Sequence, residues 1–328
     1  MSYNFIHSDK IDKQAIVEYL TRQFPERFSA EKLYDFWASR DPESYKDIIL
    51  IKDSETNEIK GITFFSKMSF YFSSAIENQY WAFDLYVDED MRKDNYGLEF
   101  MMWGRNEFQD TYCTGSGPDA QKINLAMGEQ NLGEIRKYVG IVNPWWLPFA
   151  FISGSDRFPQ RVTAPDCVFK EITDPAQLSE YALPYNSDIF EPSRDKEFLK
   201  WRFFNSTHSY HFYVRESSNE YFVVREIKFK GMRALVLVDY RINFKSQKFE
   251  SIYSTLKQIA NKIRISIIIA GSSLEATDKV LEAHHFKSIG RPRPFMGPKV
   301  YNDFKNRIKS RNFALITLAD SDGEIYYE

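Results

Sequence analysis

The chain lacks the features that several large classes of protein require. Only two cysteines occur in 328 residues, Cys113 and Cys167, and they form neither a Cys-x-x-Cys pair nor a disulfide framework. No run of about 18 apolar residues is present, and the most apolar stretch, 141–152, contains Asn143 and two prolines. The first residues show no basic segment followed by an apolar one. These absences predict a cytoplasmic protein without a membrane span.

A surplus of charge of one sign is also lacking. The 43 Lys and Arg residues nearly balance the 46 Asp and Glu residues, so the formal net charge is −3. Because a nucleic-acid coat needs a strong positive field, we expect no nucleic-acid partner. Histidines are few, and the pair His208 and His211 lacks further ligands at a metal-binding spacing, so no metal site is predicted. The motifs of serine hydrolases, P-loop NTPases and zincins are absent as well.

The composition that remains is that of a folded protein with two domains. Hydrophobic residues make up 43% of the chain and charged residues 27%, and a domain usually takes about 150 residues. Aromatic residues reach 16%, which suits either aromatic-rich cores or sugar-stacking surfaces. The aromatic segment 144–149 poses the same choice, between a platform for a sugar ring and packing between the two halves.

Two successive series of helices and strands are expected along the chain. In the first series, a strand over 3–6 and helices over 12–23 and 29–38 precede strands at 47–52, 59–71 and 79–87 and a helix over 97–108. A second series begins near Cys167, after the turn-rich segment 153–165. The pattern predicts an α/β protein with domains over 1–155 and 156–328.

The most informative stretch runs from Asp84 to Leu98, where an alternating strand leads through a polar loop into a helix. Backbone N–H groups in such a loop, continued by a helix N-terminus, form a concavity suited to a pyrophosphate. Here the sequence resembles the GCN5-related N-acetyltransferase (GNAT) superfamily. Its signature is a strand, an Arg/Gln-x-x-Gly-x-Gly/Ala loop and a helix, and Arg92, Asn95 and Gly97 occupy the three marked positions. Asn replaces the first glycine, and Asn tolerates positive φ better than most residues do.

The resemblance implies two tandem GNAT-like units, each with a mixed, mostly antiparallel sheet flanked by helices. It also implies acetyl-CoA or another acyl-CoA as co-substrate, with the pantetheine arm paired to the strand and the pyrophosphate held by the loop. The cofactor-binding residues implied are Leu85, Tyr86, Val87, Arg92, Lys93, Asp94, Asn95, Tyr96, Gly97, Leu98 and Asn131.

Two residues are candidates for proton transfer. Many GNAT proteins carry an acidic residue in the middle of this strand, which makes Asp84 a candidate general base for the attacking amine. Its alternative role is a structural hydrogen-bond acceptor. The stretch 131–138 resembles the fourth helix of the family, whose tyrosine protonates the departing thiolate, so Tyr138 is the candidate general acid. Its alternative role is packing.

The second half offers a softer resemblance. The segment 193–203 resembles a helix of tandem GNAT proteins associated with bacterial surface-polysaccharide assembly, which makes Trp201 and Arg202 candidate substrate-binding residues. At helical spacing the same side chains also suit a core stripe. The strand-to-helix junction at 239–246 has no glycine, so we expect one acyl-CoA site and a second unit that shapes the acceptor pocket.

These observations predict an N-acyltransferase that acylates a primary amine, with a nucleotide-linked amino sugar as one acceptor. Two alternatives stay open. A Fem-type aminoacyl transferase would need a basic groove for tRNA, and a degenerate GNAT-like fold would bind without catalysing. The sequence does not define the oligomeric state.

Overall fold

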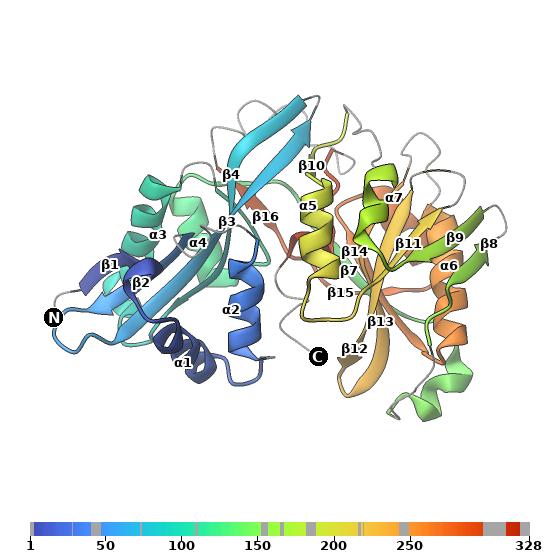
Figure 1. Cartoon of the computed structure of the whole chain (residues 1–328), viewed down its shortest axis with the longest axis horizontal. Coiled ribbons are helices and arrows are strands. Elements are labelled where there is room, and N and C mark those ends of the chain that lie inside the picture. The colour runs from blue at the N-terminus through green and yellow to red at the C-terminus, as the bar shows by residue number, and fades with distance from the viewer. Residues whose placement is uncertain are drawn as a thin grey trace. The chain divides into compact units, whose positions relative to one another are not determined.

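The computed structural model describes residues 3–27, 29–40, 47–72, 74–108, 111–151, 157–164, 167–181, 188–215, 218, 220–242, 249–297 and 313–321. The chain forms two units, each with its own sheet (Figure 1). The first consists of Met1–Phe70, Ala75–Gly133 and Arg293–Lys309, and the second of Tyr71–Ser74, Glu134–Pro292 and Ser310–Glu328. The domain boundary predicted at residue 155 lies outside the described residues.

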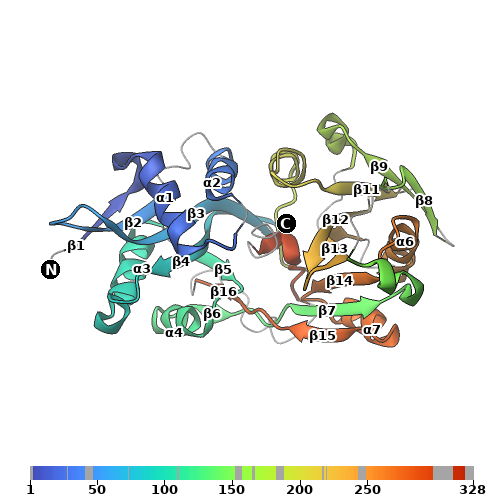
Figure 2. The ribbon, with the colours of Figure 1, turned by 90° about the horizontal axis from the view of Figure 1, so that it is seen from below.

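The first unit is built on a mixed sheet with the strand order β1-β2-β3-β4-β5-β16-β6. Its strands are β1 (Tyr3–His7), β2 (Ile48–Asp53), β3 (Ile59–Phe72), β4 (Ser74–Val87), β5 (Thr111–Thr114), β6 (Gln130–Asn131) and β16 (Pro294–Met296). Its helices are α1 (Lys13–Gln23), α2 (Ala30–Ala38), α3 (Tyr96–Glu107) and α4 (Pro118–Ala126), with short turns η1 (Ser8–Lys10) and η3 (Arg92–Asp94). Figure 2 shows α1 and α2 on one face of the sheet and α3 and α4 on the other.

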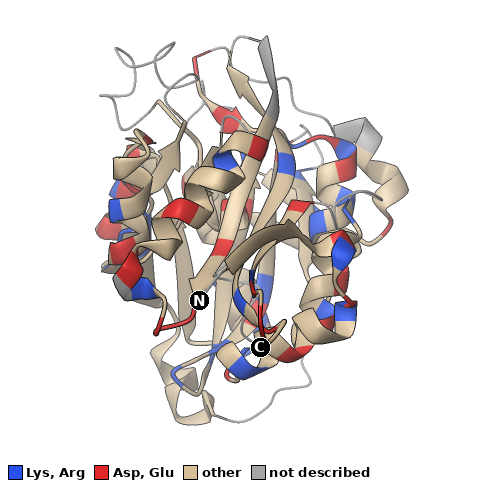
Figure 3. Ribbon diagram, turned by 90° about the vertical axis from the view of Figure 1, so that its left-hand side faces the viewer, with Lys and Arg blue, Asp and Glu red and all other residues tan. Residues whose placement is uncertain are grey.

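Local sequence explains where these helices begin. The Asp12 side chain accepts from the N–H of Gln14 at the start of α1, and the Ser29 side chain accepts from the N–H of Lys32 at the start of α2. Both helices therefore begin within a residue of the predicted positions. The predicted order of one strand, two helices, three strands and a helix is confirmed. Charges of both signs are interspersed along the helices (Figure 3).

The second unit contains an eight-stranded sheet with the order β15-β7-β14-β13-β12-β11-β9-β8. Its strands are β7 (Arg136–Ile141), β8 (Arg161–Ala164), β9 (Cys167–Ile172), β11 (His211–Arg215), β12 (Tyr221–Phe229), β13 (Met232–Arg241), β14 (Ile267–Ser272) and β15 (Lys287–Gly290), and β10 (Glu191–Pro192) is a short additional strand. Its helices are α5 (Lys196–Leu199), α6 (Phe249–Lys262) and α7 (Glu275–Ala283), with turns η4 (Pro144–Phe149), η5 (Pro175–Tyr181), η6 (Lys200–Phe204) and η7 (Leu318–Asp320).

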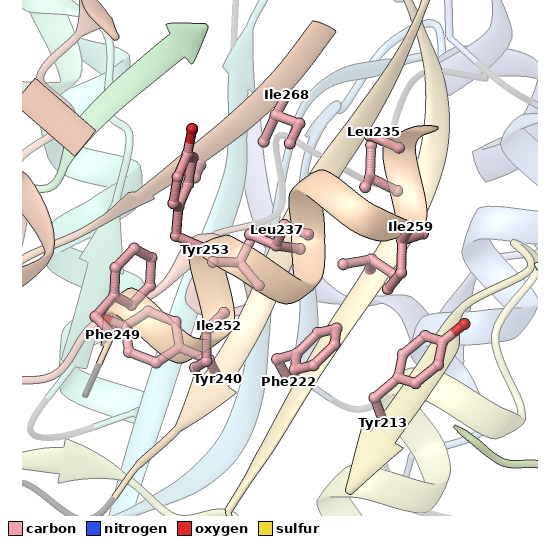
Figure 4. Packing of buried hydrophobic residues seen from close by; sticks show 14 of the residues in the cluster. Tyr213, Phe222, Leu235, Leu237, Tyr240, Phe249, Ile252, Tyr253, Ile259 and Ile268 are labelled. Atoms are coloured by element: carbon pink, nitrogen blue, oxygen red, sulfur yellow. The ribbon is translucent and has the colours of Figure 1, made fainter. Parts of the chain in front are cut away.

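Both sheets are mostly antiparallel, as predicted. The pairs β4–β5 and β13–β14 are parallel, and the other described ladders are antiparallel. In the second unit, α6 packs its apolar face on the central strands (Figure 4). Phe249, Ile252, Leu256 and Ile259 of this helix are at most 1% exposed. Burial of these side chains stabilises the second unit.

None of the described helices combines the length and apolar content needed to span a bilayer. Both cysteines are buried and carry free thiols.

Candidate functional site

Two neighbouring parallel strands of the first unit diverge. Strand β4 pairs with β5 in the described ladder only through Tyr80 with Thr111 and Trp81 with Tyr112. Strand β4 continues to Val87, whereas β5 ends at Thr114 and is followed by α4. Past the paired residues, the backbone of β4 therefore faces α4 across a gap in the sheet.

A cavity of about 560 Å³ fills this gap. Its lining comes from β4, the following loop, the start of α3 and one face of α4: Leu85, Tyr86, Val87, Arg92, Asn95, Gly97, Leu98, Asp119, Ala120, Lys122, Ile123 and Ala126. The structure thus gathers seven of the residues that the sequence singled out. A volume of this size, with a mixed apolar and polar wall, is typical of sites for small organic ligands.

The loop before α3 is closed by Arg92. Its Nε donates to the carbonyl oxygen of Val87 at 2.8 Å, and its guanidinium carbon lies 5.1 Å from the ring centre of Tyr86. The chain then turns at Asn95, whose φ of 62° and ψ of 14° are left-handed. Asn95 therefore adopts the conformation that a glycine usually provides, and the replacement leaves the turn intact.

The first turn of α3 opens toward the cavity. Asn95 occupies the N-cap position, and its side chain makes no capping hydrogen bond. The first N–H groups of a helix have no carbonyl partner within the helix, and the helix dipole makes this end attractive to anions. Gly97 and Leu98 of this turn line the cavity. An anionic group can therefore be bound here by the backbone alone.

Gly97 keeps the cavity wide without being required by protein packing. A Cβ built at Gly97 would lie 3.5 Å from Cδ1 of Ile123 and 3.8 Å from Cγ2 of Val87, which are ordinary contacts. The protein itself would accept a side chain at this position. A side chain at Gly97 would instead take up space in the cavity, between Val87 and Ile123.

Helix α4 supplies a wall that sequence reasoning missed. Its Lys122 lies 2.8 Å from Asp119, and this ammonium holds the pKa of the Asp119 carboxyl below its usual range. Together with Arg92, the lining therefore carries two cationic side chains and one anionic side chain, that of Asp119. Gly117 and Pro118 signal the start of this helix in the sequence. That the helix faces the loop before α3 depends on the divergence of β4 from β5, which the sequence does not show.

Asp84 lies directly before the residues that line the cavity, at an unusual point of the backbone. Its φ is 58°, which breaks the regular course of β4. Both carboxylate oxygens accept from Nη1 of Arg27 at 2.7 Å, and the two side chains are 8% and 16% exposed. The guanidinium of Arg27 also stacks 3.5 Å from the ring centre of Phe24. Asp84 is thus held by a nearly buried ion pair.

The helix predicted over 131–138 is wrong. Asn131 ends the short strand β6, and its Oδ1 accepts from the N–H of Gly133 at 2.7 Å in a tight turn. Gly133 has a φ of 121°, which an α-helix does not accommodate. The chain continues as strand β7 in the second unit. Asn131 does not belong to the lining of the cavity.

Tyr138 therefore stands on a strand and not on a helix. It is 1% exposed, pairs with Ala270 of β14, and donates its hydroxyl to Glu282 at 2.7 Å. Burial, followed by the hydrogen bond to Glu282, raises the pKa of Tyr138 to about 12. Tyr138 was a candidate proton donor because of its position on a predicted helix, and that helix is not formed.

The other predicted residues have mixed positions. Asp94 and Tyr96 belong to the loop and the start of α3 without lining the cavity, and the side chain of Lys93 lies outside the described part of the structure. In the second unit, Trp201 and Arg202 lie on η6 and are 4% and 0% exposed. Nη1 of Arg202 donates to the hydroxyl of Tyr210 at 2.9 Å.

Two rings of the segment 144–149 are not packed. Trp145 and Phe149 are 63% and 52% exposed, so the packing interpretation is wrong for both. Trp146, between them in the sequence, is anchored to the protein, because its Nε1 donates a hydrogen bond to Oδ1 of Asn261 at 3.3 Å.

Comparison with known proteins gives the fold a name. No family model and no curated protein sequence matches the chain. Among solved structures, Saccharomyces cerevisiae N-myristoyltransferase with bound myristoyl-CoA is similar with a TM-score of 0.60 and 12% identity, over 90% of this chain and 78% of that one. A GCN5-related N-acetyltransferase from Anabaena variabilis gives a TM-score of 0.58 and 10% identity, over 90% and 72% of the two chains. A probable N-acyltransferase from Enterococcus faecalis gives 0.59 and 9%, over the same shares.

Proposed function

The chain has a GNAT-type α/β fold across 90% of its length, consistent with two tandem units, and we propose that it transfers an acyl group from acyl-CoA to a primary amine. The observation that carries this proposal is the cavity between β4 and α4, with the uncapped start of α3 at its wall. A long ligand with an anionic centre and an extended amide arm suits this combination.

We place the pyrophosphate of CoA at the first turn of α3. The N–H groups of Tyr96 and Gly97 belong to the helix end that the dipole makes positive, and Gly97 leaves room for the phosphate oxygens. Arg92 adds positive charge from the loop, whereas the charge of Lys122 is paired with that of Asp119. The pantetheine arm would run along Leu85–Val87, where the backbone of β4 has no paired strand in the described ladder toward β5.

The reaction needs a path for one proton. The amine nitrogen attacks the thioester carbonyl carbon, a C–N bond forms, the C–S bond breaks and CoA leaves as a thiolate. We propose that Asp84 takes the proton from the amine nitrogen once the C–N bond has formed. To do so, the carboxylate must exchange one of its bonds with Arg27 for a bond to the substrate. The proton then passes to the thiolate or to solvent. Holding both substrates together supplies much of the acceleration.

We take amino sugars, including nucleotide-linked ones, as the first acceptor class to test. This choice comes from the resemblance of the segment 193–203 to proteins of surface-polysaccharide assembly. Because Arg202 is fully buried and bonded to Tyr210, its effect on an acceptor would pass through Tyr210. We propose the cytoplasm as the compartment, which suits two buried free thiols.

Release of the CoA thiol from acetyl-CoA, measured in the presence of a panel of primary amines and amino sugars, tests the proposal. Asn95→Trp should abolish release, because an indole at the loop would fill the phosphate approach. Asn57→Trp is the matched control, since Asn57 has the same φ of 62° in the turn between β2 and β3. Equal loss in both variants, or release that persists in Asn95→Trp, would contradict the assignment of the cavity.

A further inference from the structure

The second unit displays a cluster of exposed apolar side chains on one short segment. Of the seven large hydrophobic residues exposed in the described chain, four lie within residues 141–151, which we call the aromatic turn. They are Ile141, Trp145, Phe149 and Phe151, exposed by 59%, 63%, 52% and 70%. Such a concentration marks an interaction surface, because exposed hydrophobic residues are usually scattered. In Figure 1 the helical part of this turn is the light-green coil beside α6.

The aromatic turn is held rigidly. Nδ2 of Asn143 donates to the carbonyl of Ile265 at 3.2 Å, and the guanidinium carbon of Arg264 lies 5.5 Å from the ring centre of Trp146. The carbonyl of Ala150 accepts from the N–H of Arg233 at 2.8 Å, at the start of β13. The exposed rings are therefore presented by a preformed turn and need little ordering upon binding.

The segments that contact this turn are rich in basic residues. The two segments that hold it, 226–233 and 257–264, contain six basic residues and one acidic residue. That acidic residue, Glu226, forms an ion pair with Arg233 at 2.6 Å. The exposed basic residues are Lys228, Lys230, Lys257, Lys262 and Arg264. This local surplus stands out on a chain whose net charge is −3.

We propose that the aromatic turn and its basic flanks dock the second unit onto an anionic lipid surface. Trp and Phe at the apex with Lys and Arg around them is the pattern of segments that lie in a membrane interface. The aromatic rings enter the headgroup boundary while the basic side chains contact anionic headgroups. This surface lies outside the candidate active site and brings the protein to a membrane without a spanning helix.

The chemistry of the turn favours lipid over other occupants. Apart from the indole N–H groups of its two tryptophans, its one polar side chain is Asn143, which is buried and already bonded to Ile265. Recognition of a sugar needs polar groups beside the rings to bond its hydroxyl groups. Single-stranded RNA is bound in a basic groove that follows its backbone, whereas these rings are exposed together on one short segment. A second copy of this chain would bring two like-charged flanks together in a symmetric contact.

Sedimentation with vesicles tests this proposal directly. We expect the protein to bind vesicles made of equal parts phosphatidylcholine and phosphatidylglycerol, to bind much less to pure phosphatidylcholine, and to be released by salt. Replacing Trp145, Phe149 and Phe151 together by serine should abolish binding while the thermal unfolding transition is kept, because these side chains are exposed.

Charge and control variants complete the test. Lys230→Gln combined with Lys262→Gln should weaken the partition onto anionic vesicles about twenty-fivefold, because each lysine contributes about fivefold. Met102→Ser combined with Leu125→Ser is the matched control, because these side chains lie outside the turn and are exposed to a similar degree, 54% and 59%. The binding of this variant should not change. The proposal is overturned if anionic vesicles are not bound, if the triple serine variant binds them equally, or if the turn instead mediates dimerisation or polyuridine binding without vesicle binding.

Discussion

A substitution series at Asp84 separates what its backbone does from what its carboxylate does. The residue adopts a φ of 58° within β4, and its carboxylate is paired with Arg27. Asp84→Gly and Asp84→Ala both remove the ion pair. Breaking a fully buried pair costs about 3–5 kcal/mol, and because Arg27 is 16% exposed we expect about 2–3 kcal/mol here.

The two variants differ in the backbone. Glycine adopts positive φ without strain, whereas alanine in the left-handed region costs about 1 kcal/mol more. Asp84→Gly should therefore be more stable than Asp84→Ala by about 1 kcal/mol, the reverse of the usual order inside a strand. Urea unfolding measures the difference. An alanine variant as stable as the glycine variant, or more stable, would refute the reasoning about the strained turn.

The same series tests the proposed proton transfer. Asp84→Asn keeps a side chain that tolerates positive φ but no longer accepts the proton. We expect kcat for thiol release to fall by about 10²–10⁴-fold, with little change in the affinity for acetyl-CoA. A rate equal to that of the wild type would remove Asp84 from the mechanism.

Two further predictions concern Gly97, which lines the cavity, and Tyr138, which does not. Gly97→Ala should raise the stability of the protein by about 0.5–1 kcal/mol through helix propensity, and it should weaken CoA binding. A thermal melt measures the first effect and a CoA titration the second, and an unchanged affinity would contradict the prediction. Tyr138→Phe should cost about 1 kcal/mol through the lost bond to Glu282 and leave the rate unchanged, and a large fall in rate would restore Tyr138 as a proton donor. The pKa of Tyr138 is raised from 10.0 to about 12 in the folded protein, so its contribution to stability is full below pH 10.0 and is lost as the pH rises toward 12. Between these pH values the phenylalanine variant should therefore lose less stability than the wild type.

Local signals were sufficient where local physics decides the structure. Ser29 caps its helix, and Asn95 forms the left-handed turn that the loop requires. The helix predicted over 131–138 was wrong because Gly133 adopts a positive φ that breaks a helix, although the spacing of the other residues resembles a helical one.

Long-range pairing was not accessible from the sequence. The cavity exists because β5 leaves β4 after two residue pairs and α4 closes the gap, and neither event has a local signature. Strand β16 has only three residues and pairs with β5 in the first unit's sheet, about 180 positions away in the sequence. Lys122 was missed for this reason.

Calorimetric titration of CoA and acetyl-CoA tests the central claim most directly. We predict saturable binding to the wild type and to Asn57→Trp, and no binding to Asn95→Trp, because φ is 62° at both asparagines and only Asn95 lines the cavity. Binding that survives in Asn95→Trp would place CoA elsewhere, and the absence of heat and of a thermal shift with the folded wild type would contradict an acyl-CoA site in this protein.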